Sequence, residues 1–188
     1  MQSEHWRALY EVWVVQHYQD VYSWCFRMTR NQQEAEDLTQ ETFLIAYRKM
    51  HLFRGDASPK TWLLKIATRA CLKAGKRRSA AYAVTDRTAV DCAPSAEREA
   101  TVRLDREALW RCVAKLPPRE RTALLLYHAQ DQSYQEIAHV MGVSVERVKN
   151  YLHRGRRHLK TALQGEGEVH GAKRTQSADR TRRTHGSD

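Results

Sequence analysis

Apolar residues recur every three or four positions along the N-terminal part of the chain, and this spacing predicts amphipathic helices. We expect a first helix from Ser3 to Thr29, with one apolar stripe facing a protein core. The stripe consists of Tyr10, Trp13, Val14, His17, Tyr18, Val21, Cys25 and Phe26. A second helix should follow Asn31, a candidate N-cap with Glu34 three positions later as in a capping box, and end near Met50. Its buried side is expected to carry Ala35, Leu38, Thr42, Phe43 and Ile45.

Residues 51–57 are predicted to form a loop, and Ser58 with the proline after it is typical of a helix start. This third helix should run to about Arg78. Its expected apolar contacts come from Trp62, Leu63, Ile66, Ala67, Ala70 and Cys71. Apolar periodicity then fades, so we predict a helical domain over 1–78 and a linker over 79–100.

A second helical domain is predicted over residues 101–164, beginning with helices over 102–116 and 119–128. After Gln164 the chain is rich in Gly, Thr, Ser and Arg and nearly lacks apolar residues. Such a segment cannot bury enough apolar surface to offset the entropy of ordering, so we predict a disordered tail over 165–188. The expected fold is therefore all-α, with two small helical domains joined by a flexible linker.

The segment from Ser133 to Leu159 has the features of a helix-turn-helix. Ser133 opens a capping box for a short helix, Ala138 lets a second helix approach closely, and Gly142 can form the turn. Ser144 then caps a last helix with Val148, Leu152, Leu159 and Leu163 on its inner side. Its outer side carries Arg147, Lys149, Asn150, His153, Arg154 and Arg157. These cations suit phosphates, although a helical hairpin with a solvated charged face remains the alternative.

Composition narrows the classes of function. In 188 residues there are 32 Lys+Arg against 22 Asp+Glu, a net charge of +10 that favours nucleic acid or, as the alternative, an acidic membrane surface. No apolar run is long enough for a membrane span and the N-terminus lacks a signal pattern, so a cytoplasmic protein without membrane insertion is expected. The cysteines at 25, 71, 92 and 112 form no CxxC pair and are expected to be reduced hydrophobes.

Two further surfaces have a distinctive chemistry. The third helix carries cations and no acid between Pro59 and Arg78, and Phe53 and Trp62 flank the loop before it. Aromatic and basic side chains beside a loop can hold unstacked bases, but core aromatics with a solubility face would give the same pattern. The second helix presents a face with Asp37, Gln40, Glu41 and Leu44, which suits a basic protein partner or is simply solvated.

The order of these motifs resembles a known family. Residues 34–43, the segment Phe53-Arg54-Gly55-Asp56-Ala57-Ser58 and the following Thr61-Trp62-Leu63 resemble region 2 of bacterial extracytoplasmic-function RNA polymerase sigma factors. Residues 116–121, 133–138 and 144–157 are similar to their region 4, and the resemblance spans Tyr10 to Leu163. It implies a sigma factor that binds core RNA polymerase and directs promoter-specific initiation.

The resemblance also implies a role for each surface. The clamp coiled coil of the largest polymerase subunit would bind Asp37, Gln40, Glu41 and Leu44. Single-stranded −10 DNA would contact Phe53, Arg54, Gly55, Asp56, Ala57, Ser58, Trp62, Lys65, Arg69 and Lys73. Duplex −35 DNA would contact Arg147, Lys149, Asn150, His153, Arg154 and Arg157. An anti-sigma factor would sequester the chain by covering both DNA-facing surfaces.

The alternative is a helix-turn-helix repressor or activator with an N-terminal sensing or dimerisation domain. It explains the C-terminal half but gives no task to the acidic face or the basic third helix. Enzyme activity, a metal site and a cofactor are not expected, because no HExxH, Walker A or GxSxG pattern is present. Pro59, Tyr151 and Gly155 depart from the usual residues of the family, so the resemblance does not specify the promoter sequence.

Overall fold

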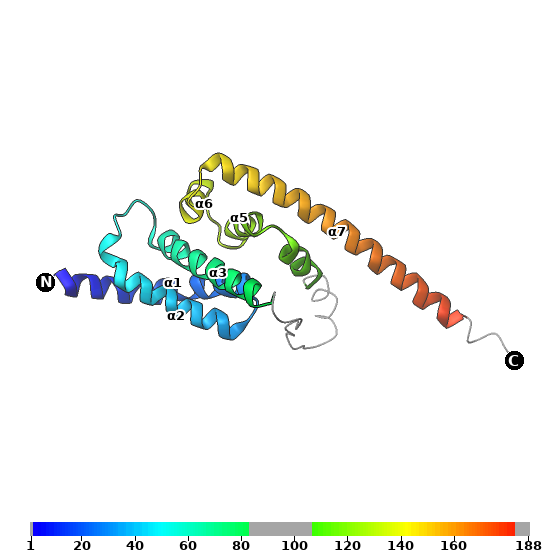
Figure 1. Cartoon of the computed structure of the whole chain (residues 1–188), viewed down its shortest axis with the longest axis horizontal. Helices are drawn as coiled ribbons and strands as arrows, with labels where there is room; N and C mark the ends of the chain where they lie inside the picture. Colours follow the sequence, from blue (N-terminus) through cyan, green and yellow to red (C-terminus); the bar gives the residue numbers. More distant parts are fainter. Residues whose placement is uncertain (1, 83–106, 183–188) are drawn as a thin grey trace. The chain divides into compact units, whose positions relative to one another are not determined.

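The computed structural model describes residues 2–82 and 107–182, and this part of the chain is helical, with no strand. Its elements are α1 (Gln2–Thr29), α2 (Gln32–Lys49), η1 (Met50–Leu52), α3 (Pro59–Tyr82), α5 (Pro118–Ala129), α6 (Tyr134–Met141) and α7 (Val145–Arg182) (Figure 1). Residues 107–115 are also helical. The all-α prediction is confirmed. The described residues group into two compact units, one with 2–82 and 122–150 and one with 107–121 and 151–182.

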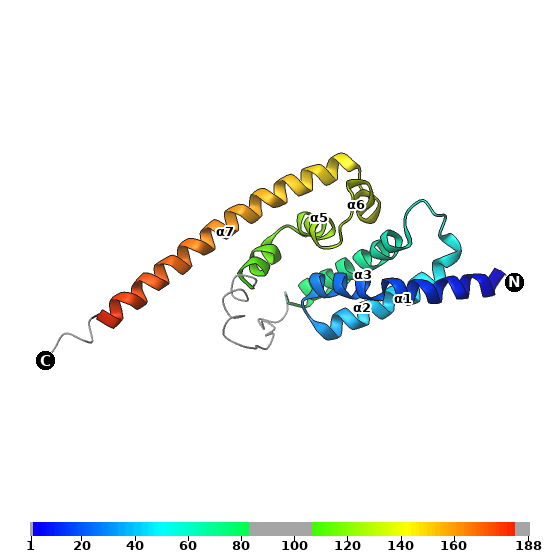
Figure 2. The ribbon, with the colours of Figure 1, turned by 180° about the vertical axis from the view of Figure 1, so that it is seen from behind.

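The first unit contains a core made by α1, α2 and α3, which lie side by side in both views (Figures 1 and 2). Fully buried side chains from all three helices meet there: Val21, Trp24, Cys25, Ala35, Ala46, Leu63, Leu64 and Ala67. Two buried threonines of α2 are compatible with this apolar core, because Thr39 and Thr42 donate to their own helix carbonyls at 2.6 and 2.7 Å. Trp24, which has no exposed surface, was not part of the predicted stripe.

The start of α2 differs from the predicted capping box in one respect. The Asn31 side chain accepts from the Glu34 N–H at 2.9 Å, so the N-cap is confirmed. The Glu34 carboxylate, however, pairs with Arg78 of α3 and does not return to the cap. The Asn31 N–H lies 3.4 Å from the hydroxyl of Thr29 instead. Glu34 therefore ties α2 to α3.

Three predicted boundaries need correction. The first turn after α2 is the 3-10 helix η1, so the loop is shorter than 51–57. Helix α3 continues to Tyr82, into the predicted linker, whose residues 83–100 lie outside the described part. Helix α7 extends to Arg182, so a disordered tail is wrong for 165–182; residues 183–188 are not described. No proline interrupts this segment, and extending an existing helix avoids the cost of nucleation.

The helix-turn-helix prediction is confirmed in its local geometry. The Ser133 hydroxyl accepts from the Glu136 N–H, and the Glu136 carboxylate accepts from the Ser133 N–H at 2.8 Å. Gly142 has φ +65°, and its N–H donates to the Ala138 carbonyl, which ends α6. The Ser144 hydroxyl then accepts from the N–H of Arg147 at 3.4 Å, at the start of α7.

Cys25, Cys71 and Cys112 are buried and free, as expected for reduced hydrophobes. A hydrogen bond with Cys25 and burial raise the pKa of Cys71, so this thiol stays protonated. Cys92 lies outside the described residues. Among the helices described, none is long and apolar enough to cross a membrane.

We expect Ser133→Ala to lower the free energy of unfolding by about 1 kcal/mol, because the acceptor for the Glu136 N–H is lost. Urea denaturation followed by circular dichroism measures this change. Thr161→Ala, at an exposed position inside α7, is the matched control and should change the same quantity by less than about 0.5 kcal/mol. Equal losses in the two variants would contradict a capping role for Ser133.

Candidate nucleic-acid interface

Helix α7 presents a polar and basic outer side over the positions predicted to read duplex DNA. Val148 and Leu152 are buried, with exposed fractions of 0% and 1%. The outward residues are all exposed: Arg147, Lys149, Asn150, His153, Arg154 and Arg157. One of these cations is engaged on the same helix, because Lys149 Nζ lies 3.5 Å from Glu146 Oε2. The arrangement fits a helix whose one side is anchored and whose other side can enter a groove.

A buried carboxylate lies behind the outward cations. Glu120 of α5 has a side-chain exposure of 8%, and its Oε2 is 2.7 Å from His158 Nδ1. Its Oε1 is 3.9 Å from Nε of Arg154, so one carboxylate contacts two residues of α7. The carboxylate thus gives Arg154 a distant ion pair, while about half of the arginine side chain, 51%, stays accessible. Glu120 lies in the motif 116–121, but no role was predicted for it.

Tyr151 occupies the space between the first turn of α5 and the outer side of α7. Its hydroxyl accepts from Nη1 of Arg119 at 3.1 Å. The Arg154 guanidinium carbon lies 5.6 Å from the centre of the Tyr151 ring, within cation–π range. Tyr151, which the sequence analysis noted only because it departs from the family pattern, therefore helps to position Arg154, a residue predicted to contact DNA.

The predicted −10 loop begins on an aromatic cluster. The ring of Phe53 lies edge-on to Trp13 at 4.7 Å and to Trp62 at 5.6 Å, measured between ring centres. Trp13 is buried, whereas Phe53 and Trp62 remain partly exposed. The loop residues Arg54, Gly55, Asp56 and Ser58 are exposed, and Ala57 is partly so. Gly55 has φ +79°, a conformation that other residues adopt only with strain.

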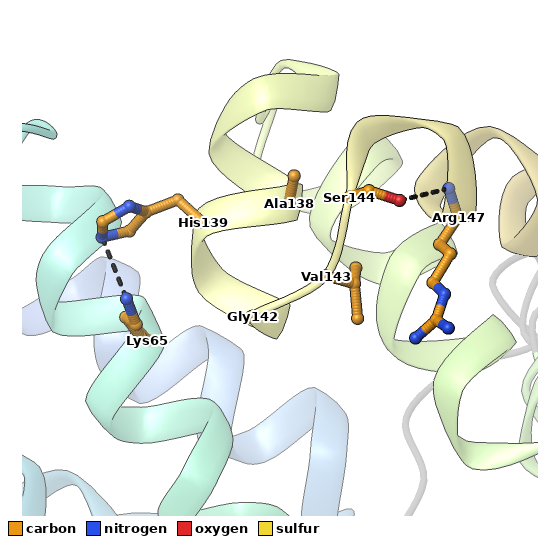
Figure 3. Close-up of a pocket in the computed structure, with 7 residues that line it drawn as sticks. All are labelled: Lys65, Ala138, His139, Gly142, Val143, Ser144 and Arg147. Atoms are coloured by element: carbon orange, nitrogen blue, oxygen red, sulfur yellow. Dashed lines mark hydrogen bonds between the residues drawn. The ribbon is translucent and has the colours of Figure 1, made fainter.

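The basic side of α3 is not uniform. Arg69 and Lys73 are exposed, as predicted. Lys65 is only partly exposed, and its Nζ lies 3.3 Å from His139 Nε2 of α6 (Figure 3). Burial and the charge of Arg69 lower the pKa of Lys65. Lys60, in the first turn, pairs with Asp20 of α1 at 3.0 Å.

The predicted acidic face of α2 is solvent-exposed. Asp37, Gln40 and Glu41 are exposed, and Leu44 has an exposed fraction of 57%. Tyr47 extends this surface with 54% exposure. No ion pair among the described residues engages Asp37 or Glu41. Two carboxylates beside exposed apolar surface are suited to a basic, partly apolar protein partner.

The sequence analysis assigned no role to Glu120, His139 or Thr61, which make side-chain contacts at these surfaces. Each is a polar residue whose partner lies far along the chain, so periodicity contains no signal for the pairing. The described residues contain no group of His, Cys, Asp and Glu that could hold a metal ion.

Comparison with known proteins gives two family matches. The Sigma-70 region 2 model matches residues 13–81, and the Sigma-70 region 4 model matches residues 106–159. The chain is 34% identical over 153 residues to RNA polymerase sigma factor YlaC of Bacillus subtilis, covering 77% of this chain and 86% of that protein. It is 30% identical over 142 residues to ECF RNA polymerase sigma factor SigM of Bacillus subtilis, covering 75% and 86%.

Two solved structures share the fold. The sigma factor RpoE of Bartonella quintana, in complex with the anti-sigma factor NepR, gives a TM-score of 0.64 at 20% identity over 80% of this chain and 94% of that one. CnrH, in complex with the cytosolic domain of CnrY, gives a TM-score of 0.64 at 19% identity over 85% and 90%.

We expect Glu120→Gln to lower the free energy of unfolding by about 1 kcal/mol, because the hydrogen bond with His158 loses its charged partner and the ion pair with Arg154 is lost while the shape is kept. Chemical denaturation at neutral pH measures the change. Glu41→Gln, an exposed position on α2, is the control and should change stability by less than about 0.5 kcal/mol. A loss no larger than that of the control would mean that Glu120 does not anchor α7.

Proposed function

The chain belongs to the extracytoplasmic-function sigma factors of the sigma-70 family, and we propose that three of its surfaces divide the work of promoter recognition. It is a promoter-directing initiation factor, with core RNA polymerase and promoter DNA as partners, and sigma factors are not enzymes. We assign region 2 to the domain predicted over residues 1–78 together with the end of α3 to Tyr82, the linker to the rest of 79–100 and region 4 to 101–164. The proposed site of action is the cytoplasm, where it would meet the polymerase and the chromosome.

The acidic face of α2 is the proposed contact with core polymerase. Asp37, Gln40, Glu41 and Leu44 would dock on the clamp coiled coil of the largest subunit. Their exposure and the absence of a described ion pair at Asp37 or Glu41 support this assignment. DNA would be repelled by the same carboxylates, so this face selects a protein partner over a nucleic acid.

The outer side of α7 is the proposed reader of −35 duplex DNA. Lys149, Asn150, His153 and Arg154 would face the major groove, with Arg147 and Arg157 at its edges. Anchoring of Arg154 by Glu120 and Tyr151 supports a base-reading role, because a positioned guanidinium can form two hydrogen bonds to guanine. The neighbouring cations, whose side chains are exposed, would contact phosphates.

The loop Arg54–Ser58 and the basic side of α3 are the proposed site for −10 single-stranded DNA. Phe53 and Trp62 would offer stacking surface at the loop, and Lys65, Arg69 and Lys73 would hold adjacent phosphates. The aromatic cluster with Trp13 supports this assignment, because it packs Phe53, at the start of the loop, against a buried side chain. Stacking tolerates any base, so the exposed polar atoms of the loop would supply sequence preference.

An anti-sigma factor is the proposed regulator. The sigma factor RpoE of Bartonella quintana was solved with the anti-sigma factor NepR, and it shares the fold of this chain. We propose that a protein of this class binds the present chain and covers its DNA-facing surfaces. Co-purification of the chain from unstressed cells would recover it.

The observation that carries the function is the presence of sigma regions 2 and 4, in that order, in one chain. Run-off transcription with purified core polymerase on a genomic fragment library tests it. Specific transcripts should appear only when both proteins are present. Binding to an operator without polymerase, with no specific transcript, would instead support a repressor.

We expect the double substitution Asp37→Lys with Glu41→Lys to weaken binding to core polymerase at least tenfold, which corresponds to about 1.4 kcal/mol. Reversed charges would oppose a basic partner surface, and no buried contact is lost. Fluorescence anisotropy of the labelled chain, titrated with core polymerase, measures the affinity. Glu11→Lys, an exposed position on α1, is the charge control. Unchanged affinity in the double variant, with an intact circular dichroism spectrum, would refute docking through this face.

We expect Arg154→Ala and Lys149→Ala to affect DNA binding in different ways. Loss of a base contact at Arg154 should reduce discrimination between the −35 site and altered sites by about 1–3 kcal/mol. Loss of a phosphate contact at Lys149 should weaken all sites alike and lower the salt slope by about 1. Holoenzyme binding to promoter duplexes across a salt series measures both quantities. Unchanged discrimination in the Arg154 variant would reduce this residue to a phosphate contact.

A further inference from the structure

Arg119 and Tyr151 form a polar pair on the surface where the first turn of α5 meets α7. The side chain of Arg119 is exposed, and that of Tyr151 is partly exposed. Nη1 of Arg119 donates to the Tyr151 hydroxyl at 3.1 Å, and this hydrogen bond is itself accessible to solvent. Neither residue is among those assigned above to contact DNA.

The pair contains hydrogen-bond donors that no described residue uses. A guanidinium carries five N–H groups, and the described contact of Arg119 engages one of them. The Tyr151 oxygen accepts that bond, so its own O–H proton can be donated to another partner. Among the described residues, no acceptor for this proton and no ion pair of Arg119 is found. The pair therefore presents one positive charge and several donors to solvent.

A phosphodiester is the ligand that this set of donors suits. Its two non-bridging oxygens share one negative charge and only accept hydrogen bonds. A guanidinium can give two parallel N–H bonds to such a group, and its charge strengthens both of them. Arginine and tyrosine side chains both contact phosphates in protein–DNA interfaces. A carboxylate on a protein partner has similar oxygens, so a test has to separate these two ligands.

The carboxylate that follows Arg119 in the chain is turned away from solvent. The side chain of Glu120 is 8% exposed, and its Oε2 lies 2.7 Å from Nδ1 of His158. Its Oε1 lies 3.9 Å from Nε of Arg154. The negative charge of Glu120 is therefore directed toward side chains of α7, which leaves Arg119 as the exposed charge that an approaching anion meets.

Tyr151 connects the pair to a residue predicted to read the duplex. The guanidinium carbon of Arg154 lies 5.6 Å from the centre of the Tyr151 ring. The two residues are three positions apart on α7, a spacing at which helical side chains are neighbours. The tyrosine thus has one guanidinium at its hydroxyl and a second over its ring. One side chain lies between the donors for an anion and an arginine suited to a base.

We propose that Arg119 and the Tyr151 hydroxyl bind one backbone phosphate of the −35 duplex, with the Tyr151 ring positioning Arg154 for base reading beside it. The inference rests on the function proposed above for α7, to which it adds a phosphate site that includes a second helix. Phosphate contacts fix the register of a protein on the duplex, whereas base contacts give sequence preference. Tyr151 contributes to the first through its hydroxyl and to the second through its ring.

The first test measures binding of the holoenzyme to a labelled duplex carrying the promoter of the strongest run-off transcript, across a salt series. Arg119→Ala should weaken binding about threefold to tenfold at every −35 sequence. It should also lower the slope of log affinity against log salt by about 1, whereas Arg119→Lys keeps the charge and should keep the slope. Arg7→Ala, an exposed position on α1, removes the same charge elsewhere and is the matched control. A slope for Arg119→Ala equal to that of the wild type would overturn the phosphate contact.

Neutral phosphates locate the contact and separate DNA from a protein partner. Uncharged methylphosphonate groups replace the backbone phosphates around the −35 site, one position at a time. At one position the replacement should weaken binding of the wild type and cause no further loss in Arg119→Ala, because the partner of that phosphate is already absent. Additive losses at every position would overturn the proposal in favour of an acidic protein partner for Arg119.

Two substitutions separate the hydroxyl of Tyr151 from its ring. Tyr151→Phe should weaken binding to all −35 sequences by about threefold, because one donor to the phosphate is lost. Tyr151→Leu also removes the ring, so discrimination between the −35 site and altered sites should fall by a further factor of about two to five. Tyr18→Phe, an exposed position on α1, is the control for loss of a hydroxyl. Equal discrimination in the two Tyr151 variants would show that the ring does not position Arg154.

Lys149→Ala and Arg154→Ala distinguish failure of this site from failure of the proposed function. If neither substitution affects binding to −35 duplexes, α7 does not read this element and the proposed function fails. If both do, while Arg119→Ala keeps the wild-type salt slope, the phosphate site fails alone. Urea denaturation provides an independent readout, because a purely structural contact between Arg119 and Tyr151 would lower the free energy of unfolding and leave the salt slope unchanged.

Discussion

The packing of α3 against α1 and α2 is the constraint on which the other surfaces depend. Leu63, Leu64 and Ala67 of α3 are fully buried, which fixes the rotation of the helix about its axis. That rotation leaves Arg69 and Lys73 in solvent and sets Trp62 beside Phe53. It also determines which side of α3 packs against α6. A single hydrophobic stripe therefore decides the positions of the charges that are proposed to bind DNA.

The fold followed closely from periodicity and caps. Ser133, Gly142 and Ser144 mark the helix-turn-helix because each caps a helix end and provides a partner for a backbone group there. Such caps involve residues close together in the chain, so they can be predicted from sequence. The continuation of α7 to Arg182 was not predicted, because the composition of residues 165–182 resembles that of a disordered segment. The backbone of these residues extends an existing helix. In this segment the amino-acid composition disfavours a helix, whereas propagation of the helix that precedes it favours one.

The sequence indicated which residues of the candidate site carry charge, but it did not indicate which residues they contact. Lys65 was named for its charge, but its contact with His139 joins residues 74 positions apart, and no spacing rule reaches that far. Glu120 shows the same gap, because its partners on α7 lie 34 and 38 positions further along the chain (154 − 120 and 158 − 120). Long-range polar pairs depend on tertiary packing, which a single sequence encodes only indirectly.

The aromatic cluster under the −10 loop has a practical consequence. Two of the five tryptophans, Trp13 and Trp62, lie within 6 Å of the Phe53 ring or of each other, measured between ring centres. Indole emission is sensitive to stacking and to solvent at such a position. The protein thus contains an intrinsic optical reporter beside the place where strands would be captured, and the kinetics of duplex opening become accessible without attaching a dye.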